Sequence, residues 1–580
     1  MNFAGNNAIM YLLSLLKPEL DKKADKNQGT ENAGKYWMVG SDGDLTFGIP
    51  ATGGNGNGMT GIANVKDYGA VGDGVENDTQ AFLDAFDACN TVYVPHGTYV
   101  LNRMLIQNRT NITMIGYGAT IKAIDNHPLW VGVLEFRNVT GLNLLGITVD
   151  GNKEGNSDYD QSRGSDNFRF VEVHNFLVKD CVSKNSFHGT MRFANSCSNG
   201  VIDNYIGDDI DVGIQFCAED GEQYNSADDK SIFASHDIRI TNCFNRGGTS
   251  EGIGFYECPG IGTVSAQYMH YNIEIDNCVF DSKSEGGVSS PFMNVKNLNI
   301  KNCKYLNTFG LKNTGLRLGQ VEDVNVMNCT FEGVHHGALV LEGGVQKNVN
   351  ITNCVFGKDC GSAITMSKTN GDTLDTTFKD CIFRDVNSEN QWFGVDCNGV
   401  RFLNCSFEAK DVESNTMMMI SKNISTDIIN CTFEDAFGTA IPILTFAGDT
   451  NATVRLIGNT GLKHFSRWTI TNINDTDFCV ISNNECYDLN YSDESGDEYV
   501  TIYTLGLRYI EFKATNANPK LEKLAYYGKD NDVLTIKFVN AITLQTGKVS
   551  YTPMSARTVS AGSLVSFVCK NNKWIEIDYG

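Results

Sequence analysis

Three aspartates lie within four positions of the segment YIGDDIDVGIQF, residues 205–216. They are Asp208, Asp209 and Asp211, and the apolar residues around them alternate as in a buried strand. Carboxylates this close repel one another, which raises the pKa of one and leaves another ionised. Such a pair can supply a general acid and a general base. The same oxygens could instead bind Ca²⁺, and Asp208 is better explained as a residue that closes a turn.

Acids, imidazoles and guanidinium groups recur in the neighbouring segments when the apolar strands are aligned on a glycine. The column contains His188, Asp209 and Asp211, Glu251, Glu285, Thr314, and His335 with His336, and Arg192 and Arg317 lie just beyond it. In a stacked structure, this column would line one edge as a groove for an extended polymer. We therefore predict Asp209, Asp211 and Glu251 as catalytic residues, and His188, Arg192, Glu285, Arg317 and His336 as substrate-binding residues.

Each of these residues could instead have a purely structural role. The acids could lie on a solvated face, the histidines could be structural, and the arginines could simply pair with the acids. The histidines and acids lack the compact spacing of a zinc site, so no metal is predicted and calcium is the only cofactor considered.

A sequence repeat indicates that these segments stack on one another as coils. The pattern Ile-x-Asn-Cys-x-Phe recurs about every 25 residues, with cysteines at 243, 278, 303, 329, 354, 381, 405 and 431. Asn tolerates the left-handed backbone of a bend, and its amide can bond to the Asn of the next coil. Cys and Phe, two residues apart, then point inward. The pattern predicts a parallel β-helix.

The chain has 18 cysteines, and the stacked ones are expected to be buried thiols. Their parallel side-chain vectors disfavour disulfides, which indicates folding in a reducing cytoplasm.

Charge and hydropathy exclude several partners. The net charge of −23 argues against nucleic acid and anionic membrane surfaces. No apolar run is long enough to span a membrane. The first 20 residues have no basic start and no cleavage site, so they predict an amphipathic helix and no signal peptide. A helix this short needs partners for its leucines, which predicts a homotrimer.

Residues 63–101, ANVKDYGAVGDGVENDTQAFLDAFDACNTVYVPHGTYVL, resemble the first segment of the pectate-lyase-like superfamily of right-handed parallel β-helices. The likeness implies an all-β, right-handed parallel β-helix of about 10–13 coils over residues 63–490. Asp78 would cap a short helix, and Phe82 and Phe86 would close the end of the solenoid.

The flanking segments suggest modules. Residues 26–43 resemble the N-termini of phage tail and baseplate proteins, and residues 49–62 form a Gly-rich linker, so 1–62 is predicted to attach the chain to a tail or baseplate protein. Residues 491–580 lack the repeat and alternate like a small β-sandwich domain for trimerisation or carbohydrate binding.

Together these features predict a phage tailspike depolymerase, made in the host cytoplasm and carried on the virion tail, that hydrolyses a bacterial surface polysaccharide. Gly207, Asp208 and Asp209 are weakly similar to the paired-aspartate motif of polygalacturonases, but that family's Asn-Thr-Asp and His-Gly motifs are missing at the expected coils. Two alternatives stay open: a polysaccharide lyase with Ca²⁺ and an arginine base, and a receptor-binding protein that does not cut its glycan.

Overall fold

The computed structural model describes residues 36–39, 45–48, 61–156, 165–186, 188–208, 212–219, 227, 229–247, 252–255, 268–281, 288–306, 314–334, 337–342, 346–357, 360, 364–367, 373–384, 393–395, 398–408, 418–420, 425–434, 444–446, 453–460, 478–482, 490–493, 498–503, 509–514, 516–525 and 530–579. The N-terminal helix, the Gly-rich linker up to residue 60, and Asp209, Asp211, Glu251, Glu285 and His336 lie outside these residues.

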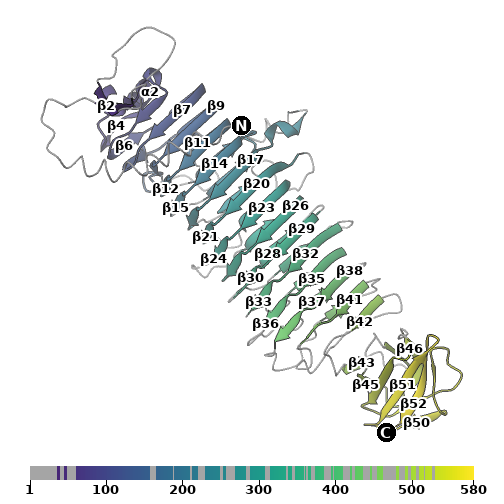
Figure 1. Ribbon diagram of the computed structural model, residues 1–580. Helices are drawn as coiled ribbons and strands as arrows, with labels where there is room; N and C mark the ends of the chain where they lie inside the picture. The colour runs from purple at the N-terminus through teal and green to yellow at the C-terminus, as the bar shows by residue number, and fades with distance from the viewer. Residues whose placement is uncertain are drawn as a thin grey trace.

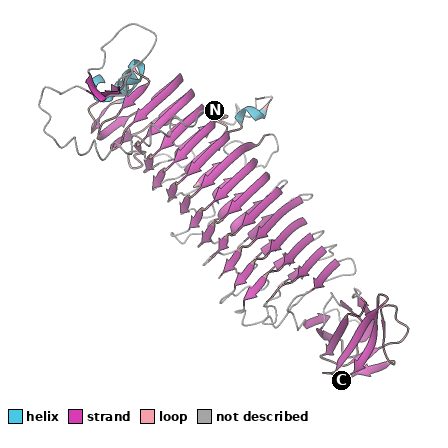
Figure 2. Cartoon of the chain, viewed as in Figure 1, coloured by secondary structure: helices cyan, strands magenta, loops and turns pink. Residues whose placement is uncertain are grey.

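The described residues form a long parallel β-helix, as predicted, with a smaller pair of sheets at its C-terminal end (Figure 1). Strands dominate the chain and helix is scarce (Figure 2). Each coil contributes strands to three faces. The third face is a sheet of β4 (Asp73–Asn77), β6 (Gly97–Leu101), β8 (Ala119–Ala123), β10 (Thr148–Asp150), β12 (Val182–Lys184), β15 (Ile206–Asp208), β18 (Phe244–Arg246), β21 (Val279–Asp281), β24 (Lys304–Leu306), β27 (Thr330–Glu332), β30 (Val355–Phe356), β33 (Ile382–Arg384), β36 (Ser406–Glu408) and β39 (Thr432–Glu434).

The first two faces are joined at the start, where long strands bend across both: β7 (Met104–Ile115), β9 (Gly132–Leu145) and β11 (Asp166–Lys179), preceded by the short β3 (Ala63–Asn64) and β5 (Thr91–Tyr93). The first face continues through β13 (Gly189–Ala194), β16 (Val212–Cys217), β19 (Ile253–Phe255), β22 (Val288–Phe292), β25 (Thr314–Leu318), β28 (Gly337–Glu342), β31 (Ile364–Ser367), β34 (Phe393–Val395), β37 (Met418–Ile420) and β40 (Leu444–Phe446). The second face comprises β14 (Ser198–Asp203), β17 (His236–Thr241), β20 (His270–Asp276), β23 (Val295–Lys301), β26 (Val321–Met327), β29 (Gln346–Thr352), β32 (Thr373–Lys379), β35 (Asn398–Leu403), β38 (Ser425–Ile429), β41 (Thr453–Ile457) and β42 (Phe478–Ser482).

The Asn of the repeat makes the bend between the second and third faces. Asn242, Asn277 and Asn302 have φ values of 57°, 53° and 54°, in the left-handed region where Asn is tolerated. The amides also form the predicted ladder, since Asn277 Nδ2 donates to Asn242 Oδ1 at 2.8 Å and Asn353 Nδ2 to Asn328 Oδ1 at 2.8 Å. Aspartates occupy some rungs, as where Asn204 Nδ2 donates to Asp180 Oδ1 at 2.7 Å, while Asn242 donates to Asp203, the residue before Asn204, at 2.8 Å.

The Cys and Phe of the repeat point inward, as predicted. Cys278 and Phe280 are fully buried, and ring centroids in the Phe stack lie 4.8 Å apart between Phe356 and Phe383. The cysteines among the described residues are free thiols, so the stack there contains no disulfide. Burial raises the pKa of the Cys181 thiol to about 12, which makes it an inert part of the core.

A short helix closes the N-terminal end of the solenoid. In α2 (Thr79–Ala88), Phe82 and Phe86 are fully buried against the first coils. Asp78 lies at the predicted N-cap position, but its carboxylate makes no capping bond to the helix and instead accepts from Val71 N at 2.6 Å and Gly72 N at 3.2 Å. The 3-10 helix η2 (Val65–Tyr68) precedes this loop, and β1 (Tyr36–Val39) pairs with β2 (Leu45–Gly48). No helix among the described residues is long and apolar enough to cross a membrane.

The C-terminal residues form two sheets, in which some strands pair in parallel and others antiparallel. One sheet holds β43 (Asn490–Asp493), β45 (Tyr509–Ala514), β47 (Val533–Phe538), β51 (Leu564–Lys570), β52 (Lys573–Tyr579) and β49 (Tyr551–Thr552); the other holds β44 (Tyr499–Tyr503), β46 (Lys520–Ala525), β48 (Ile542–Leu544) and β50 (Arg557–Val559). Strands β43, β45 and β47 pair in parallel, and antiparallel pairing begins at β51. Alternation shows that a strand is half-buried and leaves the direction of its partner open.

Candidate functional site

Charged side chains line the outer side of the first face in its early coils. The register places Glu135, Arg169, Arg192 and Gln215 in one outward column across β9, β11, β13 and β16. An outward column would normally be solvated, yet Glu135, Arg169 and Arg192 are at most 4% exposed. Charged groups are almost never buried unless they are paired, so the packing here has a specific cause.

Asp166, at the start of β11, is the centre of this cluster and is 1% exposed. Arg169 Nη1 and Arg192 Nε lie 3.0 Å and 3.3 Å from Asp166 Oδ2, and His188 Nδ1 lies 3.3 Å from Oδ1. One carboxylate therefore holds two guanidinium groups and one imidazole. The arrangement fixes the ring of His188 with its Nδ1 toward Asp166.

The ion pairs continue from Asp166 as a network over β9. Arg169 Nη2 lies 3.4 Å from Glu219, Glu219 also pairs with Arg137, and Arg137 pairs with Glu135. Arg103 Nε is the last member of this series of ion pairs and lies 2.7 Å from Glu135 Oε2. The network thus joins four arginines to three carboxylates.

Both buried carboxylates of the network stay ionised. Burial by itself would raise the pKa of Asp166, but Arg192, His188 and Arg169 hold that pKa far below its usual value. Burial likewise opposes the ionised form of Glu135, and bonds from Arg103, Gly132 N and Arg137 lower its pKa. Neither carboxyl group can serve as a general acid near neutral pH, because that role needs a raised pKa.

Two glycines make room for the cluster. A Cβ on Gly189 would lie 2.0 Å from Asp166 Oδ1, and a Cβ on Gly132 would lie 2.7 Å from the Arg169 Cβ. Gly132 N also donates to Glu135 at 3.1 Å. The glycine after His188 is thus required by the close approach of Asp166.

An exposed tryptophan stands beside His188. Trp130, in the loop between β8 and β9, is 51% exposed, and its ring centroid lies 6.2 Å from that of His188 in an edge-on arrangement. Its φ of 61° is left-handed, which costs energy in a bulky residue. Strain of this kind is concentrated at functional sites, and an exposed indole offers a flat surface to a ligand.

The Trp130 loop is anchored by a buried histidine. His127 is fully buried, and its backbone N donates to Asn156 Oδ1 at 2.8 Å while its Nδ1 lies 3.0 Å from Pro128 O. Burial lowers the pKa of His127 to about 4, and the nearby charges of Arg103 and Glu135 have smaller, opposing effects.

We expect the fold to lose stability as the pH falls from about 6.5 to about 4. In this window unfolded His127 binds a proton that the folded state excludes, so the unfolded state is favoured by up to about 3 kcal/mol. Urea unfolding measured at pH 7.5 and pH 4.5 tests this, with His127→Gln expected to flatten the difference. An equal pH dependence in both proteins would contradict it.

The structure brings two of the predicted substrate-binding residues, His188 and Arg192, together on Asp166. Arg317 lies in the same outward column, but Gln215, Gly254 and Pro291 intervene. Four coil steps separate the two arginines by about 19 Å. Asp208 lies on another face, at the end of β15, where Lys184 and Arg246 are its register partners.

The alignment on glycines is wrong by one residue in two coils and by three in another, where Thr314 pairs with Val288 rather than with the predicted Glu285. Gly189 pairs with Val212 rather than Gly213, and Gly337 pairs with Thr314 rather than Gly315. Alternation fixes which side chains share a face, but a glycine can occupy either side, so it is a poor marker of register.

Asp166 and Trp130 were not predicted from the sequence. Asp166 pairs in register with Gly132 and so falls at the coil position of Gly189, directly before the predicted column begins. Extending the column one coil toward the N-terminus would have reached Ser165, the residue before Asp166. Trp130 lies in a loop outside the repeat, where the sequence offers no register.

Two long segments, residues 218–235 between β16 and β17 and residues 256–269 between β19 and β20, connect the first face to the second at the same corner of the β-helix. Phe233 follows β16 and Tyr268 follows β19, and their ring centroids lie 6.4 Å apart in a small apolar cluster. The 3-10 helix η3 (Lys230–Phe233) belongs to the first of these segments. Glu219 lies near the start of this segment and joins it to Arg137 and Arg169.

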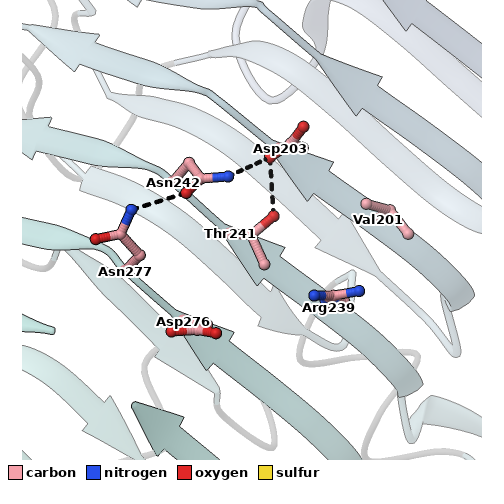
Figure 3. A pocket seen from close by; sticks show the side chains of 7 residues that line it. All are labelled: Val201, Asp203, Arg239, Thr241, Asn242, Asp276 and Asn277. Carbon is pink, nitrogen blue, oxygen red and sulfur yellow. Dashed lines mark hydrogen bonds between the residues drawn. The ribbon is translucent and has the colours of Figure 1, made fainter. Parts of the chain in front are cut away.

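A polar depression of about 310 Å³ lies on the second face, lined by Val201, Asp203, Arg239, Thr241, Asn242, Asp276 and Asn277 (Figure 3). Its hydrogen bonds run between neighbouring coils, with Thr241 Oγ1 and Asn242 Nδ2 both donating to Asp203 Oδ1. The depression is therefore part of the Asn ladder, on a different face from Asp166. Among the described residues, no three His, Cys, Asp or Glu side chains are grouped to hold a metal ion.

Parts of this chain are similar to known proteins. Residues 62–305 match the family model described as rhamnogalacturonase A/epimerase, pectate lyase-like. The pre-neck appendage protein of Bacillus phage phi29 is 30% identical over 202 residues, which cover 31% of this chain and 22% of that protein. The mannuronan C5-epimerase AlgE1 of Azotobacter vinelandii is 33% identical over 117 residues, which cover 16% of this chain and 8% of that enzyme.

Among solved structures, the tailspike protein gp49 from Pseudomonas phage LKA1 aligns with a TM-score of 0.43 at 13% identity, covering 69% of this chain and 81% of that one. This chain spans about a fifth of the phage relative's length, as the 22% coverage shows. Residues 62–305 thus carry a pectate-lyase-like β-helix, and part of the chain is related in sequence to phage pre-neck appendage proteins.

Proposed function

We propose that this chain binds and processes a bacterial surface polysaccharide as part of a phage tail appendage, and that the Asp166 cluster belongs to its active site. The observation that carries this proposal is the fully buried Asp166 holding His188 and Arg192 beneath the exposed, strained Trp130. The pectate-lyase-like match and the phage appendage relative support the substrate class and the setting.

Each group of the cluster has a chemical role in this proposal. With the Nδ1 proton of His188 donated to Asp166, its Nε2 carries a lone pair and can accept a proton. Arg192 adds a fixed positive charge next to that ring, suited to an acidic or hydroxyl group of a sugar. Trp130 offers an apolar surface on which a sugar ring can stack.

The general acid must come from a carboxyl group other than Asp166 or Glu135, because both are held ionised. Asp209, Asp211 and Glu251 remain our candidates. In sequence, Asp211 directly precedes Val212, the register partner of Gly189, just as His188 precedes Gly189. Hydrolysis by carboxylate acid and base groups remains the proposed reaction, with His188 as a second candidate for the base.

A lyase that uses Arg192 as its base is less well supported. The guanidinium lies 3.3 Å from a carboxylate in a buried setting, which favours its charged form. A glycan-binding protein without catalysis stays the main alternative, and attachment through residues 1–62 and a homotrimer remain proposals.

Trp130→Gly is expected to reduce binding of the host polysaccharide about fivefold, since a lost stacking surface of this kind is worth about 1 kcal/mol. The fold should be as stable or up to about 1 kcal/mol more stable, because glycine adopts a left-handed φ without strain. Binding measured by calorimetry, with urea unfolding alongside, checks both results.

Tyr271→Ala is the matched control, since Tyr271 is 38% exposed on the second face, where it stacks on His236. Loss of binding in Tyr271→Ala but not in Trp130→Gly would move the site to the second face. Shortened oligosaccharides without an unsaturated sugar would indicate hydrolysis, and binding without shortening would indicate a receptor-binding protein.

A further inference from the structure

The inward column of the third face is polar in the coils next to the candidate site, unlike the rest of that column. On the third face, the inward position two residues after the repeat cysteine is Phe or Tyr from Phe280 to Phe433, and each of these rings is buried. In the three preceding coils the same position holds Ser183, Gly207 and Asn245. Before them it holds the apolar Tyr99, Ile121 and Val149.

Asn167 extends this polar block under the cluster. It directly follows Asp166 in the chain and is fully buried. Its Nδ2 donates to Ser183 Oγ at 2.7 Å and lies 3.3 Å from both Val149 O and Lys184 O. One amide therefore ties the start of β11 to the end of β12, after which the chain turns toward His188.

The turn itself is closely fitted around Asn167. A Cβ on Gly151 would lie 2.7 Å from Asn167 Oδ1 and 2.5 Å from Asn185 O. Ser186 Oγ donates to Gly189 O at 3.0 Å, which closes the turn from the other side. Movement of Asn167 would therefore displace both Asp166 and the segment that carries His188.

This arrangement is unfavourable for the fold itself. Asn167 Oδ1 is buried and accepts no hydrogen bond from the described residues, and Ser183 places a hydroxyl in a buried column whose preceding residues, Ile121 and Val149, are apolar. An apolar residue would bury more favourably at either place. Natural sequences place unfavourable polar residues in an apolar core chiefly at functional sites.

We propose that Asn167 and Ser183 are positioning residues, which from inside the β-helix fix the relative placement of Asp166 and His188. The catalytic reason for this positioning rests on the proposed function. The contact geometry that it invokes can be tested without any glycan.

The experiment measures carbethoxylation of His188 by diethyl pyrocarbonate, using mass spectrometry and the more exposed His236 as internal reference. Asn167→Leu should raise the His188 to His236 rate ratio at least fivefold, and Ser183→Ala about twofold. Thr376→Val is the matched control, because Thr376 is a fully buried polar residue in a distant coil whose hydroxyl has no partner among the described residues. Its ratio should match the wild type.

An unchanged ratio in both Asn167→Leu and Ser183→Ala would overturn the proposal, and if Asn167→Leu fails to fold, Ser183→Ala decides. With a polysaccharide that the wild type processes, Asn167→Leu should lower kcat at least tenfold with little change in KM, and wild-type kcat would also overturn the proposal. Failure of the wild type to bind or process any bacterial polysaccharide would refute the proposed function, while the carbethoxylation ratio would still decide the positioning role.

Discussion

Asp166→Asn is expected to reduce processing of the polysaccharide at least about 100-fold, the scale of a lost catalytic base or its partner. The substitution removes the carboxylate that orients His188 and leaves Arg169 and Arg192 buried without their shared counter-charge. Breaking a buried pair by removing one partner also costs about 3–5 kcal/mol of stability. Activity should therefore be measured well below the unfolding transition, and stability followed separately in urea.

Asp427→Asn controls for the loss of a buried carboxylate elsewhere in the solenoid. Asp427 is 5% exposed and accepts from Arg455 Nε at 2.6 Å, many coils from Asp166. This variant should lose some stability and keep wild-type activity. Wild-type activity in folded Asp166→Asn would show that the cluster is structural.

The pH dependence separates Asp166 from the predicted acid. Because its pKa lies below the ordinary value, Asp166 stabilises the fold above the usual pKa of an aspartate, and this contribution is lost only in strong acid. An activity limb between about pH 5 and pH 8 must then belong to another group.

Asp211→Asn and Glu251→Gln should each leave the fold intact and slow cleavage at least about 100-fold, since each removes a candidate acid or base. Asp208→Asn should have a smaller effect, because Asp208 is exposed at the end of a third-face strand, and it serves as the matched control. Cleavage is measured as new reducing ends, with the anomer of the first product read by NMR. We expect inversion, which a carboxyl separation of about 6.5–9.5 Å would give.

Wild-type cleavage by both Asp211→Asn and Glu251→Gln would contradict the acid and base assignment and move the chemistry elsewhere. If Asp166→Asn alone were inactive, the His188 dyad would be the catalytic centre. Loss of polysaccharide binding in all three variants would instead indicate a shared binding role.

The repeat determined the fold from the sequence. Each coil repeats one local pattern, so the left-handed Asn, the inward Cys and the inward Phe follow from neighbours a few residues apart. Stacking identical coils then brings like residues together, which is why the Asn ladder and the Phe stack were predictable without coordinates. His188 and Arg192 were found for the same reason, since Arg192 lies in a repeated strand and His188 directly precedes that strand.

The tertiary structure alone decided what surrounds those two residues. Asp166 lies at the start of β11, well before the repeat motif of its coil, and Trp130 and Glu219 come from loops, so the spacing of the repeat does not relate them to His188. Register was also decided in three dimensions, because a glycine can occupy either side of a strand, and aligning Gly213 with Gly189 missed the true partner, Val212, by one residue. A periodic sequence determines the scaffold through local contacts, whereas the burial of an outward column of charges depends on loops whose path is set only by packing.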